Sequence, residues 1–237
     1  MRTVLPASLL CLVFAGFQSS AQSPTSDGMV RTQIQGIQIP PIANAPFTAK
    51  VVVTWEQPLS GGGTVSRMYY TLVARDSQGR VHRETRDFVP ANSGIDPPLR
   101  SFSIVDPVAG TRTVCSRVTV TCTTTNFQPS TPLAEESSNS GNVKQVSLGE
   151  QLIDSVRTVG TRQIATTTAG QGGADRLVVS NRETWYSPDL QMDLSVTRNN
   201  PQMGTVTLSV TNLVRGEPDP SWFAVPPGFG QKNASNN

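Results

Sequence analysis

The chain contains one histidine, His82, so an acid–base relay or hydrolase triad built on an imidazole would have to use that residue. His82 stands in the charged run Arg80–Phe88, which is typical of a solvent-facing or edge strand. We therefore interpret the run as a solvated face. The sequence has no nucleophile-elbow, phosphate-loop or calcium-loop motif. These features predict a protein that is not an enzyme, with no catalytic residue, no cofactor and no metal ligand.

The other residues whose types could do chemistry are Cys115 and Cys122. An alternating Thr- and Val-rich segment separates them. No second cysteine pair or histidine cluster is present to complete a zinc site. A strand also lacks the helix N-terminus that lowers the pKa of a redox-active thiol. In an oxidising compartment such an even pair predicts a disulfide. We expect it to steady a local hairpin by a few kcal/mol at most.

The first 21 residues indicate the compartment. Arg2 precedes the apolar run Leu9–Phe17, and Ser19 and Ala21 occupy the −3 and −1 positions of a cleavage site. Nine helical residues rise only about 14 Å, which is too short for a hydrocarbon core of about 30 Å. We predict a signal peptide over residues 1–21, a periplasmic or secreted protein, and no membrane span after cleavage.

Composition and charge restrict the partners. The chain has 19 Lys and Arg against 17 Asp and Glu, a net charge of +2, and its basic residues are scattered singly. A protein that binds nucleic acid concentrates basic residues in a patch or stripe, so no nucleic acid partner is expected. Hydrophobic residues make up 36% of the chain and aromatic residues 6%, which favours a modest core.

The chain divides by composition into an arm, a domain and a tail. Residues 22–46 are rich in Ser, Gln, Pro and Gly, so we expect an irregular N-terminal arm. Residues 47–230 are predicted to form a single β domain that contains a mobile loop at 128–147. Residues 231–237 are expected to be a disordered tail.

Within the domain, apolar residues recur at every second position, which is the period of a half-buried strand. We expect apolar faces formed by alternate residues of Phe47–Trp55, by Met68, Tyr70, Leu72 and Ala74, by Leu177, Val179 and Trp185, by Leu190–Val196 and by Val206–Val210. A turn is expected at Asp76–Gly79 and a break near Asp154 and Ser155. No window after residue 21 shows the pattern of an amphipathic helix.

These patterns predict an all-β, mainly antiparallel fold of about ten strands with few helices. One apolar face per strand means that the sheet must either curl on itself or stack against a second sheet. A curved meander or open half-barrel and a β-sandwich both satisfy this requirement, and the pattern does not choose between them.

Several motifs resemble an uncharacterised group of exported bacterial β-rich proteins. They are Tyr70–Arg80, Ile104–Gly110, Val159–Arg162, Trp185–Gln191 and Glu217–Phe223. More distantly, a tryptophan strand that ends in Ser-Pro-Asp and a closing Pro-Asp-Pro-Ser segment look like the outer-membrane lipoprotein carrier superfamily. That resemblance implies a half-barrel that holds acyl chains on a concave face, although such carriers use helices that this sequence does not predict.

Two functions remain open. One is an exported binding module that takes a lipid, a lipoprotein or another apolar ligand on the concave face of a curved sheet. The alternative is an interaction or structural protein of the cell envelope that has a filled core and acts through its loops. Trp55 and Trp185 are expected in the core, because both follow the apolar phase of their strands. Trp222 and Phe223 are expected in a turn that closes one end of the sheet.

Overall fold

A computed structural model describes residues 36–128, 143–167, 177–201 and 203–233. The predicted signal peptide, most of the N-terminal arm and the centre of the expected loop at 128–147 lie outside the described residues.

Thirteen strands and one short 3-10 helix form the secondary structure of the described residues. In chain order they are β1 (Phe47–Pro58), β2 (Thr64–Arg75), β3 (Val81–Arg86), β4 (Val89–Pro90), β5 (Leu99–Asp106), β6 (Thr111–Ser116), β7 (Thr121–Asn126), β8 (Val143–Ile153), β9 (Val156–Thr167), β10 (Val178–Ser187), β11 (Met192–Asn200), β12 (Gly204–Arg215), η1 (Pro220–Phe223) and β13 (Gly230–Asn233). The predicted all-β class is therefore confirmed.

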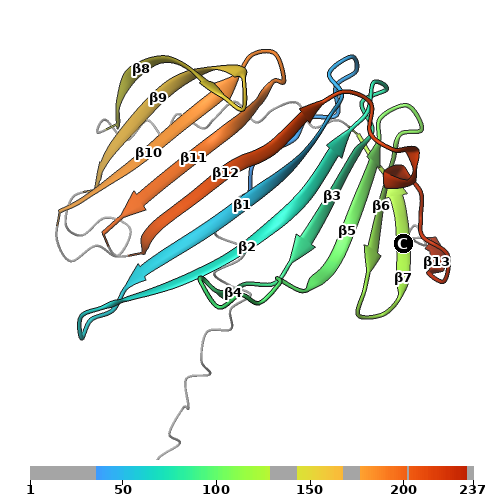
Figure 1. The fold of residues 1–237 in the computed structure, drawn as a ribbon, viewed down its shortest axis with the longest axis horizontal. Coiled ribbons are helices and arrows are strands. Elements are labelled where there is room, and N and C mark those ends of the chain that lie inside the picture. Colours follow the sequence, from blue (N-terminus) through green and yellow to red (C-terminus); the bar gives the residue numbers. More distant parts are fainter. Residues whose placement is uncertain (1–35, 129–142, 168–176, 202, 234–237) are drawn as a thin grey trace, which may run out of the picture. The chain divides into compact units, whose positions relative to one another are not determined.

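The strands form one open sheet in the order β13-β7-β6-β5-β3-β2-β1-β12-β11-β10-β9-β8, with the short β4 beside β2. Figure 1 shows β12 lying beside β1. Strands β2 to β7 and β13 lie on the β1 side of this junction, and β8 to β11 lie on the β12 side. Every described pair is antiparallel except β13 with β7. Strands β8 and β13 end the order and do not pair with each other, so the sheet is not closed.

One side of the sheet, here called the apolar face, forms the core. Phe47, Ala49, Val51, Val53 and Trp55 of β1 are between 0% and 8% exposed, which confirms the alternation predicted for this strand. Their neighbours across the ladder, Leu208 and Val210 of β12, are buried as well. The opposite side, here called the polar face, carries half-exposed residues of β1 such as Thr48 and Thr54.

Strand β2 follows the opposite phase to the predicted one. Tyr69, Thr71 and Val73 lie on the apolar face beside β1, whereas Met68 and Tyr70 lie half-exposed on the polar face. The prediction was wrong because the core side of this strand also holds polar residues. Buried polar residues usually find hydrogen-bond partners elsewhere in the chain, as Arg75 does, although the Thr71 hydroxyl has no partner among the described residues.

Arg75 is the clearest of these buried polar residues, with 0% exposure. Its Nε donates to the carbonyl of Ala45 at 2.9 Å, Nη1 to that of Pro40 at 3.0 Å, and Nη2 to that of Leu190 at 3.0 Å. Arg83 donates in the same way to the carbonyl of Ile37 at 3.1 Å. Residues 36–46 form no helix or strand, and the two arginines hold them against the sheet.

Strand β10 also places its predicted apolar residues on the polar face. Leu177 is 61% exposed and Val179 is 40% exposed, while Val178, with the opposite phase, is buried. Trp185 is half-buried on the same side as Val179 and lies outside the core. The alternation was correctly recognised, but sequence spacing alone does not say which of the two sets faces the core.

Strand β3 is an interior strand, between β2 and β5, and not the edge strand that its charges suggest. His82 is only 9% exposed, so the prediction of a solvated position was wrong. Its ring stacks on Phe102 at a centroid distance of 5.5 Å and meets Trp222 edge-on at 5.1 Å. Trp222 of the C-terminal segment covers this part of the strand. The charge pattern of β3 is local, so it contains no information about a cover that comes from a distant segment.

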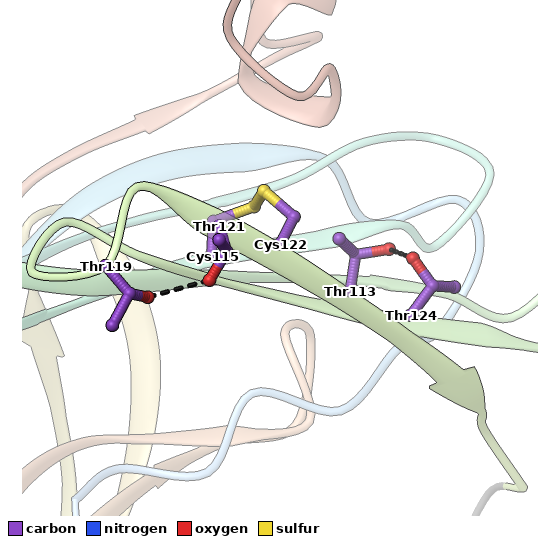
Figure 2. The surroundings of a disulfide bond; sticks show 6 residues. All are labelled: Thr113, Cys115, Thr119, Thr121, Cys122 and Thr124. Carbon is purple, nitrogen blue, oxygen red and sulfur yellow. Dashed lines mark hydrogen bonds between the residues drawn. A yellow bond between two sulfur atoms is a disulfide. The ribbon is translucent and has the colours of Figure 1, made fainter. Parts of the chain in front are cut away.

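The predicted disulfide joins Cys115 of β6 to Cys122 of β7, which lie directly opposite each other in the ladder. Figure 2 shows the disulfide with two hydroxyl pairs along the same hairpin, Thr113 with Thr124 and Thr119 with Thr121. Both cysteines are 0% exposed and pack with Phe102 and Ile104 in one cluster. Phe223, Val225 and Phe229 cover this cluster.

The C-terminal segment closes this end of the sheet, as predicted for Trp222 and Phe223. Asp219 precedes η1, and its side chain accepts a hydrogen bond from the amide of Ser221 at 2.8 Å. Strand β13 then pairs with β7, so the ordered chain extends to Asn233, into the range expected to be a tail.

The predicted turns are present. Gly79 donates its amide to the carbonyl of Asp76, and its φ of +85° suits glycine. Asp154 and Ser155 both have positive φ and join β8 to β9 as a two-residue hairpin loop. Strand β8 begins at Val143, inside the range assigned to a mobile loop.

Candidate functional site

The polar face carries aligned rows of side chains across six neighbouring strands, β9, β10, β11, β12, β1 and β2. The register gives three such rows. The first is Arg162, Glu183, Thr197, Thr207, Thr54 and Met68; the second is Ile164, Asn181, Asn199, Thr205, Glu56 and Ser66; the third is Gly160, Trp185, Ser195, Ser209, Val52 and Tyr70. Each row spans about 24 Å, from five strand spacings of about 4.8 Å.

A groove of about 550 Å³ lies at the β1–β2 end of these rows. Its floor is formed by Lys50, Thr54, Glu56, Ser66, Met68 and Tyr70, and its wall by residues 90–97 between β4 and β5. We call it the Tyr70 groove. Its volume lies within the range of about 300–1,000 Å³ that ligand sites occupy.

Tyr70 is held between groups of both charges. Its hydroxyl donates to Asp96 Oδ1 at 2.6 Å. Lys50 Nζ lies 4.0 Å from the ring centroid, and the guanidinium carbon of Arg86 lies 4.5 Å from it. The hydrogen bond to Asp96, with a contribution from burial, raises the pKa of Tyr70. The phenol is therefore kept protonated as a hydrogen-bond donor.

The wall of the groove is fastened to the sheet at several points. Arg86 donates from Nη1 to the carbonyl of Pro97 at 2.9 Å, and its Nε forms an ion pair with Glu84 at 2.8 Å. At the other end of the wall, the amide of Ala91 donates to the carbonyl of Ser66 on β2 at 2.9 Å. These contacts shape the groove before any ligand arrives, which lowers the ordering cost of binding.

A second hollow of about 300 Å³ lies on the same rows at their other end, and we call it the Arg162 hollow. It is lined by Arg162, Ile164, Asn181, Glu183, Thr197 and Asn199 of β9, β10 and β11. Arg162 donates through two nitrogens to Glu183 Oε2, at 2.8 and 3.2 Å. These hydrogen bonds lower the pKa of Glu183, so the carboxylate stays charged and paired.

Trp185 is not part of the lining of the Arg162 hollow, but it is bonded to Glu183, which is. A Cβ added at Gly160, directly opposite on β9, would lie 2.5 to 2.8 Å from three carbons of the six-membered ring. The ring therefore lies against the backbone of β9, where only glycine leaves room. Its Nε1 donates to Glu183 Oε1 at 3.1 Å, which fixes the position of the indole.

Only strand β12 separates the groove from the hollow. Its Thr205 and Thr207 stand between Asn199 and Thr197 of β11 on one side and Glu56 and Thr54 of β1 on the other. All four threonines are half-exposed. The two hollows therefore share one polar surface whose middle consists of short hydroxyl side chains.

Sequence reasoning missed most of this surface. It placed Tyr70, Met68 and Trp185 on core faces, and it assigned no role to residues 90–97. The one local signal was Asn92-Ser93-Gly94 between prolines, a turn sequence in which Asn92 and Gly94 have positive φ. The rows themselves depend on pairs such as Thr54 with Thr207, which are far apart in the sequence.

The residues first considered for chemistry lie elsewhere. His82 is enclosed by Phe102 and Trp222, and the disulfide lies beneath the C-terminal segment. Across the described ranges, no group of three or more His, Cys, Asp and Glu residues is arranged to hold a metal ion.

Comparison with protein families finds no match, and comparison with curated proteins finds none either. Among solved structures, MucB in the MucA/MucB complex of Pseudomonas aeruginosa matches 77% of this chain at 12% identity, with a TM-score of 0.40. The match covers 56% of that chain, little more than half its length.

Two further structures match over most of their own length. LprF of Mycobacterium bovis matches 78% of this chain and 90% of its own, with 16% identity and a TM-score of 0.30. A LolA superfamily protein of Nitrosomonas europaea matches 78% of this chain and 92% of its own, with 8% identity and a TM-score of 0.32.

Proposed function

We propose that the protein is a non-enzymatic binding protein of the cell envelope or extracellular space, and that its ligand occupies the Tyr70 groove. The observation that carries this proposal is a preformed hollow of about 550 Å³ with Lys50, Tyr70, Met68 and Glu56 on its floor. It combines apolar surface with a few fixed polar groups, as small-molecule sites do.

The disulfide supports a location outside the cytoplasm, because such bonds persist in oxidising compartments. The described ranges contain no helix with the length and hydropathy that a membrane span requires.

An acyl chain on the apolar face is the alternative ligand, and the sequence resemblance to lipoprotein carriers favours it. An acyl chain needs accessible apolar surface in proportion to its length. The apolar face of β1 is at most 8% exposed, and Leu194 and Leu208 are 0% exposed. A lipid would have to displace packed side chains there, so the geometry supports the polar face better.

Ligand-observed NMR with a mixed library of sugars, peptides, lipids and small amphiphiles tests the proposal. We expect library members to bind the native protein and to lose binding in Ser66→Trp, which fills the floor of the groove. Thr48→Trp is the matched control, since Thr48 lies on the same face of β1 outside both hollows. Hits that bind Ser66→Trp and the native protein equally would contradict the proposal, as would a folded protein that binds nothing.

A further inference from the structure

We infer that the ligand of the polar face is a neutral oligosaccharide, which lies across the strands from Trp185 to the Tyr70 groove. This inference rests on the proposed function, because it names the class of ligand for the same surface. It follows from the chemistry of the rows, from the position of Trp185 and from the balance of charge.

The rows between the two hollows supply groups that suit sugar hydroxyls. Thr197, Thr207 and Thr54 belong to the first row, and Asn199 and Thr205 belong to the neighbouring second row. Hydroxyl and amide side chains both donate and accept hydrogen bonds, as the hydroxyls of a sugar also do. An acyl chain would leave these groups unpaired, which costs free energy.

Trp185 supplies an aromatic plane at one end of the third row. One side of its ring lies against the backbone at Gly160, and the indole nitrogen is bonded to Glu183. The side chain is only half-buried, so part of the ring remains accessible, next to Glu183 of the Arg162 hollow. The C–H groups of a sugar ring carry partial positive charge and pack on the electron-rich face of an aromatic ring.

The distance between the two aromatic residues of that row defines an extended ligand. Trp185 and Tyr70 are separated by β11, β12 and β1, which corresponds to about 19 Å, or four strand spacings of about 4.8 Å. A single sugar unit is much shorter than this. The surface therefore fits a chain of sugar units that spans both hollows.

The charges on the surface favour a neutral ligand. Arg162 is paired with Glu183, and Arg86 is paired with Glu84 and Asp96. Lys50 and Glu56 contribute one charge of each sign to the groove. These residues are three cations and four carboxylates, so the surface has no excess of positive charge and lacks the electrostatic attraction that a strongly anionic polymer would need.

An array of immobilised neutral and charged oligosaccharides tests the inference, followed by calorimetric titration of the full exported chain with the neutral oligosaccharide that binds best. We expect Trp185→Ala to weaken binding at least tenfold and Trp185→Phe, which keeps a flat ring, to retain most of it. The double variant Thr197→Val, Thr207→Val removes hydroxyl groups at nearly constant volume and should also weaken binding at least tenfold. Thr48→Val is the matched control and should bind as the native protein does.

Thermal unfolding of each variant shows that it is folded, so that a loss of binding can be assigned to the surface. The inference is overturned if no neutral oligosaccharide binds, if only charged ones do, or if Trp185→Ala and Thr48→Val bind equally. A peptide or lipid that binds the native protein and is blocked by Ser66→Trp would overturn the inference while leaving the proposed function intact. A protein that binds no member of the library would remove both.

Discussion

Tyr70 and Asp96 are joined by a hydrogen bond of 2.6 Å that ties the wall of the groove to its floor. Tyr70 comes from β2, whereas Asp96 belongs to the segment between β4 and β5. Because Asp96 also lies 3.4 Å from Arg86, one carboxylate links the wall to both strands beneath it. The shape of the Tyr70 groove therefore depends on this contact.

Removing the carboxylate should lower the pKa of Tyr70. In the native protein, the hydrogen bond to Asp96 stabilises the protonated phenol and raises its pKa. In Asp96→Ala that contribution is lost, while Arg86 still favours the phenolate. Ultraviolet difference titration, with Tyr70→Phe to assign the signal, should show the pKa of Tyr70 falling relative to the native protein. An unchanged pKa would mean that this hydrogen bond does not form in solution.

Arg75 should be essential to the attachment of residues 36–46. Arg75→Met removes the donors for three carbonyl groups, and each unsatisfied buried group costs about 1–3 kcal/mol. We expect a loss of about 2–4 kcal/mol in the free energy of unfolding by urea, together with faster hydrogen exchange at Ala45. Arg117→Met, at an exposed arginine, is the control and should change stability by less than about 0.5 kcal/mol.

Burial of Arg75 also lowers the pKa of its guanidinium to about 10, with a further contribution from Arg215. The group nevertheless remains charged at neutral pH.

This buried cation explains why local spacing predicted β1 correctly and failed on β2. The alternation of Phe47 to Trp55 is a local property of one half-buried strand. The phase of β2 depends on Ala45, Pro40 and Leu190, which satisfy Arg75 from outside the strand.

The same distinction applies to the candidate site. The sequence predicted the disulfide, because two cysteines seven positions apart on adjacent strands are a local pattern. It did not predict the polar rows, because β1 and β12, which pair in the sheet, stand near opposite ends of the domain sequence. It also misjudged His82, since Trp222 covers that residue from a distant segment.

His82 should make stability depend on pH. Burial lowers its pKa, while Glu84 and the backbone of Trp222 act in the opposite direction. The unfolded state therefore binds a proton more readily than the native state does, and stability falls as the pH drops below the unfolded pKa of about 6.5. His82→Gln should remove this slope. We expect the urea midpoint of the native protein to fall relative to that of His82→Gln as the pH is lowered from about 7 to about 5. If plots of midpoint against pH run parallel for the two proteins, the assignment to His82 is contradicted.

Reduction of the disulfide should weaken the C-terminal end of the sheet. The bond closes a short loop, for which loop-closure entropy gives about 2–3 kcal/mol. The cysteines also pack beneath Phe223 and Phe229. In the double variant Cys115→Ser, Cys122→Ser we expect lower stability by about that amount and earlier proteolysis near Phe229. Equal stability of the native and double-variant proteins would show that packing alone holds this hairpin.

The most direct measurement of the central claim is NMR of the protein with labelled threonine, valine and leucine methyl groups and labelled indole nitrogen, recorded while the neutral oligosaccharide that binds best is titrated in. The account predicts shift changes at Thr54, Thr197, Thr205 and Thr207 and at the indole N–H of Trp185, while Thr48 stays unchanged. Changes confined to core residues such as Val53 and Leu194, or no changes at the polar rows, would contradict the claim that this face is the binding surface.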